Sequence, residues 1–383
     1  MRHIPFNRPS LSGREHECLL EVLAGFHLAG NGPFGGRCQK WLEERHQSRR
    51  AFLTHSCTGA LEMAALVLDV RPGDEVILPS FTFVSTANAF VLRGAVPVFV
   101  DIRPDTLNLD ESLVEAAITA RTRVIVPVHY AGVGCEMEQL CTIARARSIR
   151  IIEDAAQGLL ARYRCRPLGS YGDMSTLSFH ETKNVVAGEA GALLINDEHL
   201  VKRAQIIWEK GTDRSQFLEG KVDKYTWRDV GSSFQPSEIT AAFLWAQLME
   251  ADRITRERLS VWHVYHKAFE PFEKRGLVRR PVVPPATEHN GHMYYLLLRE
   301  GGIRAEILAR LNEKGVNAIF HYVPLHLSAG GRRFGRVAGS MQHTETLSER
   351  LIRLPLWAGM QDDDLSYVVD CVAEELEREL SRT

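Results

Sequence analysis

Short apolar runs alternate with amphipathic stretches between about residues 50 and 196, and this alternation is the feature that most constrains the fold. Seven runs are candidate strands: Ala51–Thr54, Glu75–Leu78, Val96–Val100, Val124–Val128, Arg150–Glu153, Thr176–Phe179 and Ala192–Ile195. Three segments between the first five runs fit helices: Ala60–Val70, Ser112–Ala120 and Glu136–Arg147. Apolar strands separated by helices are typical of a mostly parallel sheet with both faces covered. We therefore expect an α/β fold in which ligands bind at the carboxyl ends of the strands.

The second half of the chain has a different pattern. Helical patterns cover His199–Gly211 and Glu238–Lys274. A smaller mixture of elements follows: a strand at Met293–Leu298, a helix at Ala305–Lys314, a strand at Ala318–Tyr322 and a helix near Asp362–Arg378. Because 383 residues exceed the usual length of one domain, we expect a large domain over residues 1–250 and a smaller C-terminal α+β domain over residues 251–383.

Two polar residues follow neighbouring candidate strands. Asp154 directly follows the strand Arg150–Glu153, and Lys183 closes a polar turn that begins after Phe179. Pyridoxal phosphate needs an amine to condense with its aldehyde and an acidic partner that keeps its pyridine nitrogen protonated. The sequence therefore predicts a pyridoxal phosphate site in which Lys183 and Asp154 are the catalytic residues.

The phosphate of such a cofactor would bind at the start of a helix, where backbone N–H groups are free. Residues 54–62 fit this description, because a strand end is followed by a turn of small residues and a helix start. Ser56 and Thr58 in this turn fit simple helix caps equally well. Ser178, just before the lysine turn, is a candidate for a second phosphate contact.

Aromatic and amide side chains near the strand ends fit the remaining cofactor contacts. Phe81 and Phe83 follow the second strand, and either ring could cover the pyridine ring, although both also fit an ordinary core position. Gln157, on the turn after Asp154, could reach the phenolic oxygen of the cofactor.

Composition excludes several other classes of protein. A formal charge of -2 argues against sequence-independent nucleic-acid binding. The 7 scattered cysteines contain no CxxC pair, and they fit a reduced cytoplasmic compartment better than a disulfide framework or a metal site. No apolar run is long enough to cross a bilayer, so we expect no membrane partner. The glycine-rich segment 30–36 has no Walker lysine and follows no strand, so we do not interpret it as a P-loop.

Four segments of the chain are similar to the sugar aminotransferases of the DegT/DnrJ/EryC1/StrS family: Ile4–Asn7, Glu153–Gln157, Ser178–Lys183 and Ser348–Leu356. The resemblance implies the type I fold of pyridoxal phosphate-dependent transferases, with Lys183 bound to the cofactor and Asp154 at its ring nitrogen. It places five further residues around the cofactor: Gln157 at the phenolic oxygen, Phe83 against the ring, and Cys57, Thr58 and Ser178 around the phosphate.

The resemblance also implies that two subunits share each site. Many members carry a Gly-Tyr-Asn-Tyr-Arg segment whose asparagine reaches the phosphate of the neighbouring subunit. Here the segment reads Gly231-Ser-Ser-Phe-Gln235, so Ser233 takes the place of that asparagine. We expect a homodimer at the least, or a tetramer.

Three longer stretches indicate the substrate: Pro79–Gly94, Val126–Gly132 and Asp223–Asp229. They are similar to family members that make dTDP-4-amino-4,6-dideoxy-D-galactose for the enterobacterial common antigen. The implied reaction aminates dTDP-4-keto-6-deoxy-D-glucose with L-glutamate, which leaves 2-oxoglutarate, and the cofactor passes through pyridoxamine phosphate. Candidate substrate contacts are Phe6, Lys210, Arg214, Tyr225, Trp227, His321 and Tyr322.

Other activities on the same fold remain open at this point. The amine could enter with the gluco configuration, or at C3 of the sugar. Some relatives are pyridoxamine phosphate-dependent sugar dehydratases, but they have a histidine where this chain has Lys183. A non-catalytic dimeric relative should have lost Lys183 or Asp154, and this chain has both.

Overall fold

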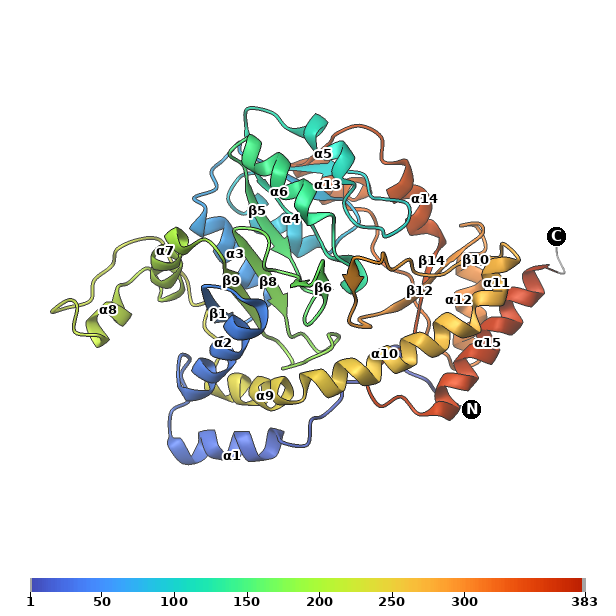
Figure 1. Ribbon diagram of the computed structural model, residues 1–383, viewed down its shortest axis with the longest axis horizontal. Coiled ribbons are helices and arrows are strands. Elements are labelled where there is room, and N and C mark those ends of the chain that lie inside the picture. Colours follow the sequence, from blue (N-terminus) through green and yellow to red (C-terminus); the bar gives the residue numbers. More distant parts are fainter. Residues whose placement is uncertain (1, 381–383) are drawn as a thin grey trace.

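Helices and strands alternate along most of the chain in a computed structural model that describes residues 2–380 (Figure 1). The strands are β1 Arg50–Thr54, β2 Glu75–Pro79, β3 Val96–Val100, β4 Thr122–Ile125, β5 Arg150–Asp154, β6 Arg162–Tyr163, β7 Arg166–Pro167, β8 Met174–Ser178, β9 Gly191–Ile195, β10 Val278–Arg279, β11 Thr287–Glu288, β12 Tyr294–Leu298, β13 Arg336–Val337 and β14 Leu351–Leu354.

The helices are α1 Glu15–Gly25, α2 Pro33–His46, α3 Cys57–Val67, α4 Val84–Val91, α5 Glu111–Ala117, α6 Met137–Ala146, α7 Glu198–Trp208, α8 Arg214–Leu218, α9 Glu238–Met249, α10 Ala251–Ala268, α11 Glu270–Lys274, α12 Arg304–Glu313, α13 Ala329–Phe334, α14 Gln342–Arg350 and α15 Asp362–Leu380. Two short 3-10 turns, η1 Tyr130–Gly132 and η2 Leu325–Leu327, lie between them. Within the described residues, no helix is both long enough and apolar enough to span a bilayer.

The large sheet has eight strands in the order β1-β9-β8-β5-β4-β2-β3-β13. Strands β8, β5, β4, β2, β3 and β13 pair in parallel, whereas β9 runs antiparallel to both of its neighbours. This arrangement confirms the predicted α/β fold with a mostly parallel sheet. In particular, Asp154 on β5 pairs with Thr176 on β8, so the ends of these two strands are fixed side by side.

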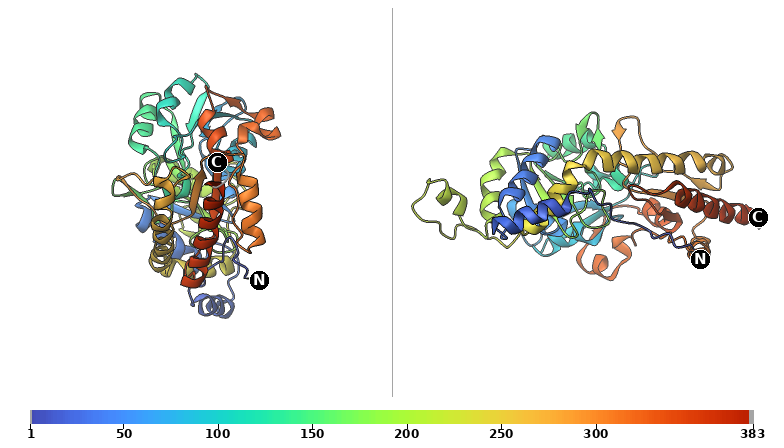
Figure 2. Two further views of the ribbon diagram at one scale, coloured as in Figure 1. Left: turned by 90° about the vertical axis from the view of Figure 1, so that its right-hand side faces the viewer. Right: turned by 90° about the horizontal axis from the view of Figure 1, so that it is seen from below.

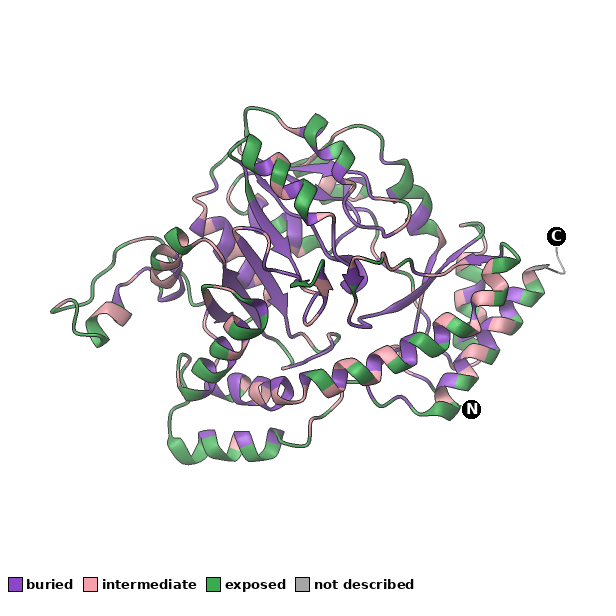
Figure 3. Cartoon of the chain, in the orientation of Figure 1, coloured by how far each residue is buried: buried purple, intermediate pink, exposed green. Residues whose placement is uncertain are grey.

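Successive residues of each strand pack against helices on opposite faces of this sheet. Ile152 of β5 belongs to a core with α3, α4 and α7, whereas its neighbour Ile151 packs with α5 and α6. On β9, Leu193 joins the first of these cores, and Leu194 packs against α2 and α9. Burial on both faces explains why these strands are continuous apolar runs rather than alternating ones, and Figure 3 shows the strands of the large sheet mostly as buried.

A second, smaller sheet, β10-β12-β14, is antiparallel and packs with α10, α12 and α15. Its core does not follow the expected division at residue 250 throughout. Ile4 from the beginning of the chain packs in this core, while β13 pairs with β3 and Leu325 packs under the large sheet. The chain therefore passes between the two cores more than once, and both described ends lie at the same end of the molecule (Figure 2).

One predicted element of the C-terminal half was wrong. The segment Ala318–Tyr322 is not a strand, since only Ile319 forms an isolated bridge, with Arg353. The rings of the consecutive residues His321 and Tyr322 stack with centroids 3.6 Å apart, which the alternating side chains of a strand do not allow. The predicted helical character of residues 238–274 is confirmed, and the segment is divided into three helices: α9 ends before Glu250, and α11 has a proline in its first turn.

The glycine-rich segment 30–36 forms the start of α2. The Glu238 carboxylate of α9 accepts the N–H groups of Gly32 at 3.0 Å, Phe34 at 2.8 Å and Gly35 at 2.9 Å. A carboxylate of the chain itself therefore occupies the position at which a P-loop would hold a phosphate, in agreement with the interpretation from sequence.

Asn290, just before β12, joins three segments that border the ends of the large-sheet strands. Its amide donates to the carbonyl oxygens of Gln157 at 2.8 Å and Leu159 at 2.9 Å, and its own carbonyl accepts the amide of Asn184 at 2.9 Å. Gly132 lies against this junction with a φ of +78°, and a Cβ atom there would lie 2.1 Å from the Asn290 Oδ1 atom.

Replacement of Gly132 by alanine tests this junction. We expect Gly132→Ala to lower the free energy of unfolding by at least about 3 kcal/mol, because a positive φ and a steric overlap add together. Gly73→Ala is the matched control, since Gly73 has a φ of +86° and open space around it. It should cost only about 1 kcal/mol. Urea denaturation of both variants measures the difference, and equal losses would contradict the steric role of Asn290.

Candidate active site

The buried carboxylate of Asp154 marks the carboxyl end of β5. One of its oxygens accepts the Thr86 hydroxyl at 2.8 Å and the other accepts the Ala156 N–H at 3.1 Å. The Thr86 hydroxyl of α4 lies 2.9 Å from that of Thr82, just before this helix. The Thr86 hydroxyl and the Ala156 N–H fix the orientation of the Asp154 carboxylate.

Lys183 lies on the turn after β8, where its N–H donates to the His180 carbonyl at 2.9 Å. Its half-buried amine makes no hydrogen bond or ion pair with residues 2–380. Burial lowers the pKa of this amine from its ordinary value, and the nearby Cys57 and Asp154 only partly oppose the effect. The structure therefore brings Lys183 and Asp154 into one electrostatic environment, and the lysine tends towards its neutral, nucleophilic form.

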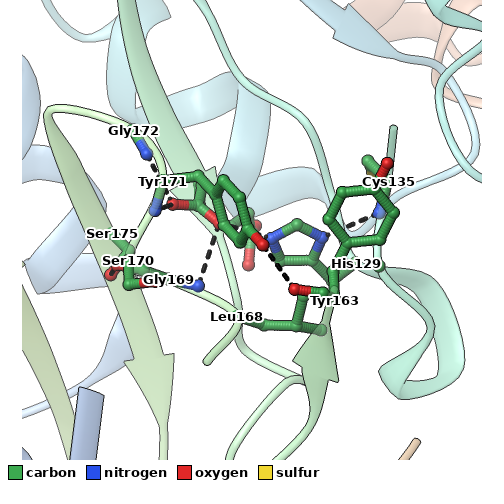
Figure 4. A network of polar contacts seen from close by, with 12 residues as sticks. His129, Cys135, Tyr163, Leu168, Gly169, Ser170, Tyr171, Gly172 and Ser175 are labelled. Carbon is green, nitrogen blue, oxygen red and sulfur yellow. Dashed lines mark hydrogen bonds and ion pairs between the residues drawn. The ribbon is translucent and has the colours of Figure 1, made fainter. Parts of the chain in front are cut away.

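A fully buried carboxylate, that of Glu153, precedes Asp154 on β5, and Figure 4 shows the loop residues and His129 that contact it. Glu153 accepts the N–H groups of Tyr171 at 2.6 Å, Gly172 at 2.7 Å and Gly169 at 2.9 Å, and the His129 ring nitrogen lies 2.8 Å away. Burial alone would raise the pKa of Glu153, but His129 and the N–H groups reverse that effect and hold it lowered. His129 thus has a structural role.

The start of α3 lies opposite the lysine turn. Ser56 caps this helix by accepting the Gly59 N–H at 3.0 Å, and the Thr58 hydroxyl lies 2.8 Å from that of Ser85. The N–H groups of Cys57 and Thr58 occupy the first helical positions, which have no partner within a helix. Burial raises the pKa of the Cys57 thiol to about 12, so this cysteine is not a nucleophile at neutral pH.

Aromatic residues form one wall of the site. Tyr322 stacks on His321, whose Nδ1 atom lies 2.7 Å from the Tyr130 hydroxyl. The Gln157 amide donates to the Tyr322 hydroxyl at 3.1 Å, and its oxygen accepts the Ala131 N–H at 2.7 Å. Burial lowers the pKa of His321 well below its usual value, so the ring in this wall is neutral.

Phe83 lies at the outer edge of this wall. Its ring is 56% exposed, and its centroid is 6.5 Å from that of Tyr322. Both rings border a cavity of about 480 Å³ between α4 and α13. By contrast, Phe81 is buried against Tyr130, so it is the core residue of the two phenylalanines. A larger cavity of about 740 Å³ lies at the amino ends of β5 and β8, away from Lys183.

Five predicted site residues lie in an exposed arm, residues 210–233, that projects from the body of the molecule beside α7 (Figures 1 and 3). They are Lys210, Arg214, Tyr225, Trp227 and Ser233. Trp227 is 82% exposed, and the arm is held to itself through the Asp213 carboxylate, which accepts the Thr226 N–H at 2.7 Å and the Arg228 guanidinium at 2.6 Å. Within the described chain, no contact joins any of these five residues to Lys183 of the same chain.

Sequence reasoning missed several residues that the structure brings to the site. Thr86 donates to Asp154 from the unpredicted helix α4, and Tyr130 holds His321. Arg353 of β14 acts electrostatically on Lys183, and its guanidinium carbon lies 4.6 Å from the ring centre of Phe6. The sequence contained one signal for Arg353, because this arginine is the charged residue within the otherwise apolar run 351–356.

These residues fit pyridoxal phosphate. An unpartnered amine and an oriented carboxylate lie at neighbouring strand ends, beside a helix start with free N–H groups. The Thr176 hydroxyl is buried beside the Cys57 thiol at the start of α3. Among residues 2–380, no group of three or more His, Cys, Asp or Glu side chains has the arrangement of a metal site.

The chain matches the DegT/DnrJ/EryC1/StrS aminotransferase family over residues 9–373. It is 31% identical to the spore coat polysaccharide biosynthesis protein SpsC of Bacillus subtilis, over 97% of this chain and 96% of that protein. The fold is similar to the aminotransferase TlmJ from Streptoalloteichus hindustanus, with a TM-score of 0.90 and 27% identity over 98% of this chain and 100% of the other. It is also similar to the PLP form of Spr1654 from Streptococcus pneumoniae, with a TM-score of 0.89 and 26% identity over 98% and 99% of the two chains.

The lowered pKa of Lys183 predicts a stability that depends on pH in the cofactor-free protein. At a pH below the lowered pKa, Lys183 is charged in both the folded and the unfolded chain, so burial of the charge lowers the free energy of unfolding by its full amount. At a pH above the usual value of 10.5, Lys183 is neutral in both states and this loss of stability disappears. Lys183→Met should therefore be more stable than the wild type at pH 7, and the gap should close as the pH rises towards 10.5.

Chemical denaturation of both cofactor-free proteins at several pH values measures this gap. Lys202→Met replaces an exposed lysine of α7 and should show no such trend. A gap between wild type and Lys183→Met that stays constant with pH would contradict the lowered pKa of Lys183.

Proposed function

Since the chain belongs to the DegT/DnrJ/EryC1/StrS aminotransferase family, whose members are pyridoxal phosphate-dependent sugar aminotransferases, we propose that it transfers the amino group of L-glutamate to C4 of dTDP-4-keto-6-deoxy-D-glucose. The product is dTDP-4-amino-4,6-dideoxy-D-galactose. The observation that carries the proposal is the unpartnered Lys183 amine beside the hydrogen-bonded Asp154 carboxylate.

Lys183 is the residue that moves protons in this reaction. Pyridoxal phosphate, when bound, supplies an electron sink for the charge that develops at the reacting carbon. The Lys183 Nζ atom takes the proton from Cα of glutamate in the first stage and delivers a proton to C4 of the sugar in the second. Burial favours the neutral amine that the first step needs.

Asp154 would hold a proton on the pyridine nitrogen of the cofactor. The Thr86 hydroxyl and the Ala156 N–H orient the carboxylate for this role. Cys57, Thr58 and Ser178 would hold the phosphate, Gln157 would contact the phenolic oxygen, and Phe83 would cover the ring.

Three observations support a nucleotide-linked sugar as substrate. The stretches 79–94, 126–132 and 223–229 resemble enzymes that act on this substrate. SpsC, a relative over nearly the whole chain, takes part in the synthesis of a surface polysaccharide. His321, which is close enough to Lys183 to feel its charge, stacks on Tyr322, and Phe6 lies under the Arg353 guanidinium; these rings could stack on the sugar or the base. A precursor for a cell-surface polysaccharide, such as the enterobacterial common antigen, is the expected use of the product.

The exposed arm supports a homodimer with shared sites. Its aromatic residues, including Trp227, are too exposed to stabilise the single chain. We place Ser233, Lys210 and Arg214 at the site of the second subunit, where the serine would contact the cofactor phosphate and the two cations would neutralise the diphosphate of the substrate.

The direct test incubates the protein with dTDP-4-keto-6-deoxy-D-glucose and L-glutamate and determines the C4 configuration of the product by NMR. We expect an axial amine and one equivalent of 2-oxoglutarate. Lys183→Ala should still bind pyridoxal phosphate but lose roughly 1,000-fold or more in turnover, since it lacks the catalytic base. Lys202→Ala, at an exposed lysine, should match the wild type. Unchanged turnover by Lys183→Ala would overturn the assignment.

Subunit mixing tests the arm. The double variant Trp227→Ala, Ser233→Ala and the variant Lys183→Ala should each be inactive alone. After random mixing, half of the dimers combine the two variants and contain one intact site, so about a quarter of wild-type activity should return. Recovery of activity requires that the arm of one subunit contributes to the site of the other subunit. If mixed dimers form but activity does not return, the arm contributes to the site of its own subunit.

A further inference from the structure

A cavity at the amino ends of β5 and β8 lies apart from the residues of the proposed reaction. It has a volume of about 740 Å³ and is bordered by α6, the β6–β7 hairpin and the turn before β8. Arg150 begins β5 at this cavity, whereas Asp154 ends the same strand at the site of Lys183, so about 13 Å of strand separates the two ends. We infer that this cavity is a second binding site, which takes a phosphorylated organic ligand of nucleotide size.

Buried apolar side chains line part of this cavity. They are Ala144 of α6 together with Ile149 and Ile151 around the start of β5. The half-buried Cys141 of α6 also lines the cavity, and its thiol donates to the Tyr171 carbonyl at 3.6 Å. An apolar lining favours the uncharged rings of an organic ligand, and the volume lies within the usual range of small-molecule sites.

The cavity also has more arginines than carboxylates, in a chain whose formal charge is -2. The charged residues of its lining are Arg145, Arg150, Arg164, Arg166, Glu138, Asp173 and Asp197. The carboxylates are already paired, because the Arg150 guanidinium lies 2.5 Å from Asp173 and 2.8 Å from Asp197. The Arg164 guanidinium likewise lies 2.6 Å from Glu138. The other two arginines of the lining remain for a ligand.

These two residues, Arg145 and Arg166, make no ion pair within the described chain. The Nε atom of Arg145 donates to the Cys141 carbonyl at 3.1 Å, and the Nη2 atom of Arg166 donates to the Ser170 carbonyl at 2.7 Å. The remaining N–H donors of both guanidinium groups have no partner among residues 2–380. The guanidinium carbon of Arg166 lies 4.2 Å from the ring centre of Tyr171, and this stacking holds the planar group in place.

Both guanidinium groups lie near the same thiol. Burial raises the pKa of Cys141 to about 11, and the charges of Arg145 and Arg166 act in the opposite direction. A guanidinium group binds a phosphate through two parallel hydrogen bonds, and two such groups match the double negative charge of a phosphate monoester. A nucleoside phosphate combines this charge with rings that can cover the apolar lining, so the expected ligand belongs to this class.

Alkylation of Cys141 in the cofactor-loaded protein is a local test. Iodoacetamide modifies thiols, and mass spectrometry of the Cys141 peptide reports on this cavity separately from the active site. Thymidine triphosphate at a saturating concentration should slow this alkylation by at least about 10-fold, because a bound ligand covers the thiol. The exposed Cys165, which lies outside the lining, should react at an unchanged rate.

Two fragments of the probe separate the contributions of its phosphates and its rings. Thymidine lacks the phosphates, and inorganic triphosphate lacks the rings. Each should need a concentration roughly 10-fold higher or more to give the protection that thymidine triphosphate gives, because each loses one part of the contact.

Replacement of the two arginines tests their role. In the double variant Arg145→Gln, Arg166→Gln, the concentration of thymidine triphosphate for half-maximal protection should rise roughly 30- to 100-fold, because two charge-assisted contacts are lost. The matched control is Arg147→Gln, Arg256→Gln, which removes the same charge at exposed arginines outside the lining and should behave as the wild type. Calorimetric titration of the three proteins gives a second measurement that does not depend on the reactivity of the thiol. Any binding of the nucleotide at the active site is common to all three.

No protection of Cys141 by thymidine triphosphate, or equal affinities of the wild type and the double variant, would overturn the inference. Equal half-maximal concentrations of thymidine triphosphate and inorganic triphosphate would overturn the nucleotide assignment, since the apolar lining would then contribute nothing. A similar loss in the Arg147→Gln, Arg256→Gln control would also count against it, because overall charge rather than these two arginines would be responsible. None of these measurements requires transamination, so the inference is tested independently of the proposed function.

Discussion

The parallel pairing of β5 with β8 is the constraint on which the site depends. It holds Asp154 beside Thr176 and starts the lysine turn from the neighbouring strand end. Glu153 stabilises this pairing, because its buried carboxylate binds three backbone N–H groups and the His129 ring. Without it, these buried donors would need other hydrogen-bond acceptors. Adjacent carboxylates on one strand thus have different roles: Glu153 organises the loops, and Asp154 faces the ligand.

Segments distant in sequence complete this site. Asn290 links the loop after β5 to the lysine turn, and Arg353 arrives from β14. The small sheet therefore does more than cover the large one, since its strand β14 supplies Arg353. Hydrogen bonds fix the side chains of Asn184 and Gln157, whereas Lys183 and the Nε atom of Arg353 have no partner within the described chain. This contrast distinguishes residues that hold the structure of the site from residues that are available to a ligand.

The sequence was most informative where local patterns determine structure. Asp154 and Lys183 could be predicted because each follows a buried strand, and parallel strands end at a common edge. Thr86 and Arg353 could not, because their roles depend on contacts between segments about 70 and 170 residues from Asp154 and Lys183. The segment 318–322 looks like a strand from its apolar residues, but tertiary stacking of His321 on Tyr322 overrides that preference. The sequence likewise did not predict that residues 210–233 project from the body of the molecule as an exposed arm.

The return of β13 to the large sheet has a mechanical consequence. Enzymes whose two lobes are joined by a single flexible link can clamp on a substrate by rotating one lobe as a rigid body. Here three segments connect the two lobes: the N-terminal segment, the junction of α9 with α10, and the stretch around β13. These connections resist a hinge motion, so access of the substrate to the site depends on side-chain movements rather than on the rotation of one lobe.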